Sequence, residues 1–107
     1  MVAASRIEVF ERMLQSDPGN TLVMFGLAKE YEKAGQHTNV VRVLNDYLQR
    51  ADDEGNAYGM LARAYEKLGQ RDEARRVYEQ GIEVATRHGH PSMAEEYRMT
   101  LADEYED

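Results

Sequence analysis

The sequence contains no cysteine, no tryptophan and only two prolines among 107 residues. Without cysteine the chain has neither disulfides nor thiolate metal sites, and its redox compartment stays open. Basic residues are also few, 13 against 20 acidic ones, which leaves a formal net charge of −7. Because a protein that binds phosphate backbones neutralises them with basic groups, we expect neither nucleic acid nor an anionic membrane as a partner.

A long hydrophobic run is missing as well. The longest apolar stretch, residues 22–28, is far shorter than the roughly 20 residues that a membrane helix needs. The first residues also lack the basic and then apolar segments of a secretory signal. These absences predict a soluble protein of the cytoplasm.

Helical periodicity dominates what is present. Alternating β-branched residues bounded by hairpin turns do not occur, and both prolines lie between periodic segments. Apolar residues recur every three or four positions, which predicts an all-α chain of about six helices joined by short loops. Asn20 and Asp72 are expected to be N-caps. Ser92 and Glu95 have the spacing of a capping box, which predicts the start of the last helix.

The chain carries an internal repeat. Residues 27–36 read LAKEYEKAGQ and return at residues 61–70 as LARAYEKLGQ, an offset of 34 residues. A fixed period of this length is typical of proteins that stack identical helix pairs. Gly35 and Gly69 are expected to end helices in the left-handed conformation, which costs glycine nothing.

Within each copy a large residue, a leucine, an alanine and a tyrosine recur at the same spacings. They are Met24, Leu27, Ala28 and Tyr31 in the first copy and Tyr58, Leu61, Ala62 and Tyr65 in the second. This pattern resembles the tetratricopeptide repeat, whose signature begins Trp-x2-Leu-Gly-x2-Tyr. The resemblance is looser at the second helix of each repeat, at Val40 with Leu44 and at Ala74 with Tyr78.

The resemblance implies a short right-handed α-solenoid of antiparallel helix pairs, forming one domain over residues 1–107. Two full repeats, residues 20–53 and 54–88, are flanked by a half-repeat helix in residues 1–19 and a capping helix in residues 89–107. The inner repeats hold Val40 and Ala62 where the flanks, 34 residues away, hold Arg6 and Glu96. These polar substitutions predict that both flanking helices face water, as terminal repeats do.

The resemblance also implies that the first helix of each repeat lines a concave groove. The expected lining residues are Leu22, Phe25, Gly26, Lys29 and Lys33, and then Asn56, Gly59, Met60, Arg63 and Lys67. Four of them are cations, in two pairs whose members lie one helical turn apart. An anionic ligand would relieve the repulsion within each pair. We therefore predict a groove for a partner's peptide that carries acidic residues and places an apolar anchor near Phe25 and Met60.

Other interpretations remain open. The cations are alternatively an ordinary solvated face, whose side chains pair within their own helices. The expected pairs are Lys29 with Glu32, Arg63 with Glu66 and Lys33 with Glu30. A different class of function is structural self-association, as a homodimer or assembly subunit joined through Val9, Val41 or the last helix. His88 and His90 are loop residues rather than evidence of a metal. Since no phosphate-binding loop, nucleophile elbow or acid–base pair is present, we expect a non-catalytic adaptor or scaffold without a cofactor.

Overall fold

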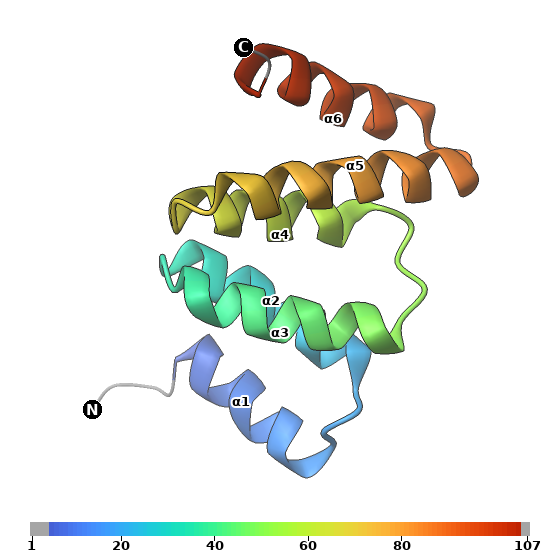
Figure 1. The fold of residues 1–107 in the computed structure, drawn as a ribbon. Coiled ribbons are helices and arrows are strands. Elements are labelled where there is room, and N and C mark those ends of the chain that lie inside the picture. The colour runs from blue at the N-terminus through green and yellow to red at the C-terminus, as the bar shows by residue number, and fades with distance from the viewer. Residues whose placement is uncertain (1–4, 106–107) are drawn as a thin grey trace. The chain divides into compact units, whose positions relative to one another are not determined.

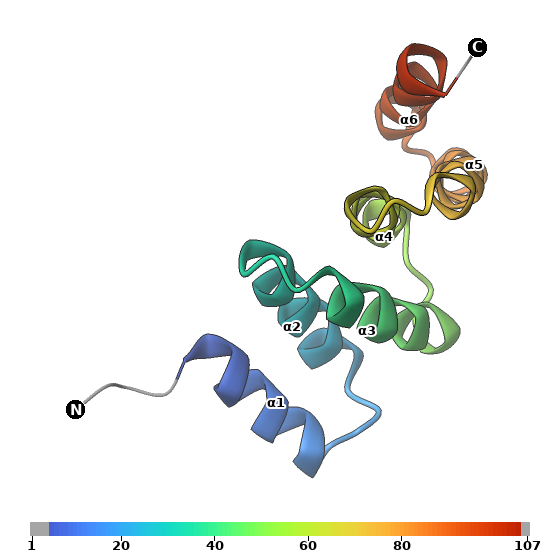
Figure 2. The same ribbon diagram turned by 60° about the vertical axis from the view of Figure 1, so that its left-hand side comes forward.

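The computed structural model describes residues 5–105 and folds them into six helices (Figures 1 and 2). The helices are α1 (Arg6–Ser16), α2 (Thr21–Lys33), α3 (His37–Arg50), α4 (Asn56–Lys67), α5 (Arg71–Arg87) and α6 (Pro91–Glu104). No strand occurs in this described part of the chain. The all-α fold class predicted from the sequence is confirmed.

The chain divides into two compact units, Met1–Ala51 and Asp52–Asp107. In the first unit α2 packs against both α1 and α3, and in the second α5 packs against both α4 and α6. Each unit therefore contains one complete helix pair and one flanking helix. The expected repeat boundaries, after residues 19, 53 and 88, all fall in loops between helices.

Glycine ends both repeated stretches in the same way. Gly35 and Gly69 have φ angles of 73° and 75°, in the left-handed region predicted for them. In each copy the N–H of the following glutamine donates to the carbonyl of the repeat tyrosine at 2.9 Å. These bonds satisfy carbonyls that the last turn of a helix otherwise leaves free. Gly89 ends α5 with the same geometry, at a φ of 78°.

The helix starts agree with the sequence only in part. Asn20 caps α2 as predicted, since its side chain accepts from the Val23 N–H at 3.2 Å. Asp72 does not cap α5, because that helix begins one residue earlier and places Asp72 in its first turn. Ser92 does not form the predicted capping box, because α6 begins at Pro91. Proline suits a first helical position, where its missing N–H needs no partner.

The repeat residues form the buried core of each unit. Leu27 and Leu61 are each 2% exposed, and Ala28 and Ala62 are completely buried. Alanine at these positions lets the two helices of a repeat approach closely. The flanking helices contrast with them, because α1 contains no fully buried residue and α6 contains only Ala94. Among residues 5–105, no helix combines the length and apolar character required to cross a membrane.

Candidate functional site

The exposed side of α2 brings three predicted site residues together in the first unit. Leu22 is 85% exposed, and Phe25 and Lys29 follow it along the same helical stripe. The Phe25 ring packs against the Tyr47 ring of α3, with 5.4 Å between the two ring centroids. The Lys29 Nζ lies 5.1 Å from the centroid of the Phe25 ring, within the range of a cation–π contact. This surface, Leu22 with Phe25 and Lys29, is called the α2 patch below.

The rest of the α2 face is already engaged within the unit. The Lys33 Nζ lies 3.5 Å from Glu30, whose carboxylate also pairs with Arg6 at 3.2 Å. Gly26 faces α1, because a Cβ at this position would lie only 3.1 Å from the Phe10 ring. Lys33 therefore has an internal partner, and Gly26 packs beneath α1 instead of lining a groove.

The predicted residues on α4, in the second unit, fall into two groups. Asn56, Arg63 and Lys67 are exposed. Met60 is only 5% exposed and Gly59 is buried. Met60 thus belongs to the core and offers a ligand almost no surface, and Gly59 lies beneath α6 instead of lining a groove.

Tyr97 of α6 is the residue that covers Gly59. Its hydroxyl accepts from the Gly59 N–H at 3.2 Å and donates to the Gly55 carbonyl at 2.7 Å. In the other five helices, the fourth N–H donates directly to the carbonyl of the N-cap residue. The Tyr97 hydroxyl takes the place of that bond in α4. Burial raises the pKa of Tyr97, which keeps the bridging phenol protonated.

Two helical glycines accommodate the Tyr97 ring. A Cβ added at Gly59 would lie 2.7 Å from the Tyr97 hydroxyl, and one at Gly81 of α5 would lie 2.9 Å from the ring. Both distances are too short for ordinary packing. This contact of Tyr97 was not predicted from the sequence. Glycine in a helix interior lowers the stability of the helix. Gly59 and Gly81 were therefore the signal in the sequence that another side chain packs closely against α4 and α5.

The C-terminal end of α6 is fastened by a polar cluster around Glu66. The Glu66 carboxylate accepts from the Tyr105 hydroxyl at 2.7 Å and from the Tyr78 hydroxyl at 3.3 Å. The Arg71 guanidinium lies 4.4 Å from the centroid of the Tyr105 ring.

An open pocket of about 520 Å³ adjoins this end of the unit, lined by Tyr65, Gly69, Gln70, Arg71, Asp72 and Glu73. Its lining holds one cationic side chain, Arg71, and two anionic ones, Asp72 and Glu73, which favours internal pairing over one charged ligand.

This cluster predicts a loss of stability at alkaline pH. Burial, reinforced by the hydrogen bond to Glu66, raises the pKa of Tyr105 from 10.0 to about 12. The folded state therefore favours the neutral phenol, and its stabilising contribution is complete below about pH 10 and lost as the pH rises through about 12. We expect the free energy of unfolding in urea to fall between about pH 9 and about pH 11.5. Tyr105→Phe should reduce this fall, and an equal fall in the variant would contradict the assignment.

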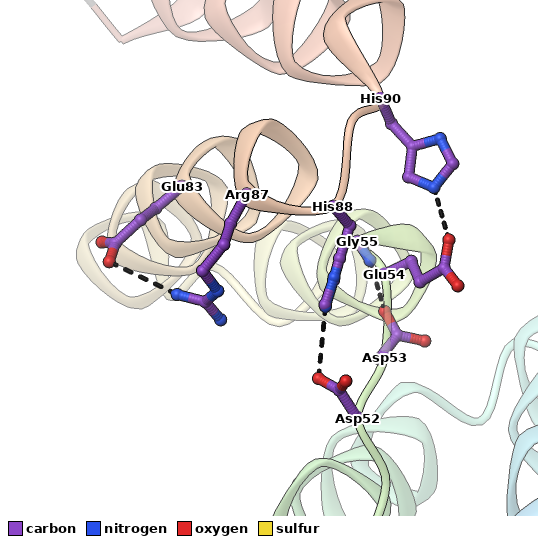
Figure 3. Close-up of polar contacts among 8 residues, drawn as sticks. All are labelled: Asp52, Asp53, Glu54, Gly55, Glu83, Arg87, His88 and His90. Atoms are coloured by element: carbon purple, nitrogen blue, oxygen red, sulfur yellow. Dashed lines mark hydrogen bonds and ion pairs between the residues drawn. The ribbon is translucent and has the colours of Figure 1, made fainter.

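The acidic segment before α4 contacts the histidine loop after α5 (Figure 3). Asp53 accepts from the backbone N–H groups of Gly55 at 2.8 Å and Ala57 at 3.0 Å, and so satisfies free donors at the start of α4. Asp52 pairs with His88 at 3.3 Å, and Glu54 pairs with His90.

These contacts tie the two histidines to residues that are distant in the sequence. Their partners lie 36 residues earlier in the sequence, in the segment before α4. The hydrogen bond and charge of His90 lower the pKa of the Glu54 carboxyl. In residues 5–105, no three or more histidine and acidic side chains gather in a way that could hold a metal ion. The contacts fasten the loop to the start of the second unit.

Comparison with known proteins agrees with the repeat geometry. A family model described as tetratricopeptide repeat matches residues 55–88, which contain α4 and α5. The chain is also 30% identical over 95 residues to the TPR repeat-containing protein PA0015 of Pseudomonas aeruginosa. That alignment covers 89% of this chain and 90% of the relative. The chain therefore belongs to the tetratricopeptide repeat family.

Proposed function

We propose that this protein is a non-catalytic adaptor that binds a peptide segment of a partner protein. Tetratricopeptide repeats generally mediate protein–protein interactions, and both the family model and the bacterial relative fall in this class. The α2 patch is the contact surface that we assign to the peptide in the first unit. The exposed residues Asn56, Arg63 and Lys67 of α4 are the contact surface that we assign in the second.

The single observation that carries this proposal is the exposure of Leu22 beside an aromatic–cation pair. A leucine that is 85% exposed contributes little hydrophobic free energy to folding, since most of its apolar surface remains in water. Phe25 presents part of its ring next to it, and Lys29 lies over that ring. An apolar peptide side chain can cover Leu22 and Phe25 while a neighbouring carboxylate approaches Lys29.

The two faces support different parts of the recognition. Because Met60 is 5% exposed, the α4 face offers polar and cationic groups but little apolar surface. We therefore assign the apolar anchor of the peptide, and an acidic residue beside it, to the α2 patch, where Lys29 lies. Arg63 and Lys67 form a separate surface of the second unit, which we assign to acidic residues of the partner protein. Since the whole chain has a net charge of −7, these cations are local exceptions that favour an acidic ligand.

The proposal predicts the peptides that bind and the substitutions that weaken them. We would probe the full chain with an array of peptides of about 15 residues, in which acidic residues flank one leucine or phenylalanine. Lys29→Glu is expected to weaken the best binder by about tenfold or more, because a charged hydrogen bond becomes a repulsion. Leu22→Ala should weaken the same peptide without lowering the stability of the fold, since Leu22 is almost fully exposed.

The controls separate this patch from general electrostatic attraction. Arg76 of α5 is 63% exposed and pairs with Glu73, so Arg76→Glu makes the same charge change away from the assigned surfaces. It should leave peptide binding within about twofold of the original protein. Lys67→Glu tests the α4 surface separately. Failure of every peptide to bind, or equal binding to the Lys29→Glu and Arg76→Glu variants, would contradict the proposal. The cytoplasmic location expected from the sequence remains a prediction.

A further inference from the structure

Each complete repeat shows how its first helix fits on its second helix. In the first unit α2 is the first helix and α3 is the second, and the two pack together. The signature residues on both helices are at most 3% exposed, namely Met24, Leu27, Ala28 and Tyr31 on α2 and Val40, Val43 and Leu44 on α3. In the second unit α4 and α5 pair in the same order, with Ala62 and Ala74 fully buried.

The helix α1 corresponds to a second helix that has no first helix before it in the described residues. Counted by the 34-residue period, Val9 corresponds to Val43 and Met13 corresponds to Tyr47. Val9 is 43% exposed and Met13 is 45% exposed, whereas Val43 is 3% exposed. The face of α1 that would pack against a first helix, which carries Val9 and Met13, is therefore exposed to solvent and is called bare below.

The opposite situation occurs at α6, which corresponds to a first helix that no described second helix follows. Its residues at the four signature positions are all exposed, namely Ser92, Glu95, Glu96 and Met99. Ala94 and Tyr97 lie on the other side of the helix, and Ala94 is 1% exposed. Met99, at 56% exposure, lies among acidic side chains on the bare side.

The two bare faces are complementary in charge. The face of α1 carries Arg6 next to Val9 and Met13, with Arg12 at its edge. The face of α6 carries Glu96 and Glu95, and Glu95 also pairs with the exposed Arg98 at 3.4 Å. Arg6 occupies the repeat position of Val40, and Glu96 occupies that of Ala28 and Ala62. An arginine–glutamate pair would thus replace the contact between small side chains. Arg6 already pairs with Glu30 through Nε, but its side chain is 73% exposed and a guanidinium has further donors.

We propose that the α6 face of one copy of this protein binds the α1 face of a second copy and so completes a repeat across two molecules. The polar residues that were expected to face water at both flanks are, in this assignment, the specificity contacts of the interface. Pairing of α1 with α1, or of α6 with α6, would instead oppose like charges. Because the two faces differ, the contact is heterologous, and further copies can either extend the assembly or close it into a ring. The α2 patch takes no part in this contact.

Sedimentation velocity of the full chain tests the proposal. At low salt the weight-average sedimentation coefficient is expected to rise between about 10 µM and about 1 mM protein. Raising the salt from about 0.05 M to about 0.5 M should reverse the rise, because the paired charges are exposed enough to be screened. The double variants Arg6→Glu with Arg12→Glu, and Glu95→Arg with Glu96→Arg, should each stay monomeric. An equimolar mixture of the two should associate again, since it restores opposite charges at both contacts.

Two further variants distinguish a loss of the interface from a loss of the fold. Met13→Glu opposes an acid to the acidic α6 face, and because Met13 is 45% exposed the fold should tolerate it. It is expected to weaken association by about tenfold or more. Arg76→Glu is the matched control and should associate like the original protein. A monomer at about 1 mM would overturn the proposal, as would a mixture of the charge variants that stays monomeric. Undiminished association of the Glu95→Arg and Glu96→Arg variant would also overturn it, because it would indicate pairing of α1 with α1.

Discussion

Replacing Tyr97 with alanine is expected to lower the free energy of unfolding of the second unit by about 3 kcal/mol or more. The ring lies against Gly59 and Gly81, at distances that leave no room for a Cβ on either glycine. The substitution leaves a cavity between α4, α5 and α6 and removes the hydroxyl that bridges Gly55 to Gly59. Urea unfolding followed by circular dichroism measures the change.

Two variants divide this effect between the ring and the hydroxyl. Tyr97→Phe is expected to cost only about 1 kcal/mol, because the Gly59 N–H can then bond directly to the Gly55 carbonyl, as in the other helices. Met99→Ala is the matched control on the exposed side of α6, at 56% exposure, and should stay within about 0.5 kcal/mol of the original protein. A loss below about 1 kcal/mol for Tyr97→Ala would show that α6 does not hold α4 through this residue.

The second large effect is expected from overpacking the helix crossing inside a repeat. Ala62 has no exposed surface, and Ala74 on the facing helix has none either. Ala62→Leu inserts three carbon atoms where the backbones approach closely, and should lower the free energy of unfolding by about 1–3 kcal/mol. Ala28→Leu makes the same test in the first unit. Both are measured by urea unfolding.

An exposed alanine provides the comparison for these two substitutions. Ala102 of α6 is exposed, so Ala102→Leu adds the same atoms without displacing a neighbour. We expect it to change stability by no more than about 0.5 kcal/mol. If Ala62→Leu and Ala102→Leu proved equally harmless, the crossing would not be close at Ala62, and the structural reason for a small residue in the signature would be lost.

Features that depend on neighbouring residues could be predicted from the sequence. The left-handed glycines Gly35 and Gly69 and the Asn20 cap each act within one or two turns of their own helix, so a short stretch of residues determines them. The cap predictions at Asp72 and Ser92 were wrong because a neighbouring residue competed. The preceding glycine turn starts α5 before Asp72, and Pro91 takes the first helical position of α6.

Contacts between distant residues could not be predicted in this way. Tyr97 bonds to Gly55 across 42 residues of sequence, and His90 reaches Glu54 across 36. Neither pair is part of the repeat signature, so the period that located the helices carries no information about them. The burial of Met60 also depends on packing that the repeat period does not describe. Its position in the repeat places it on the first helix, but only the packed structure shows that its side chain turns inward.

The bridge from Tyr97 to Gly55 has a consequence for the way the chain is made. Synthesis on the ribosome proceeds from the N-terminus, so α4 emerges well before the residue that completes its first turn. Until the last helix has left the ribosome, the Gly55 carbonyl and the Gly59 N–H lack their tyrosine partner. The start of α4 therefore acquires these two hydrogen bonds only after α6 has been synthesised.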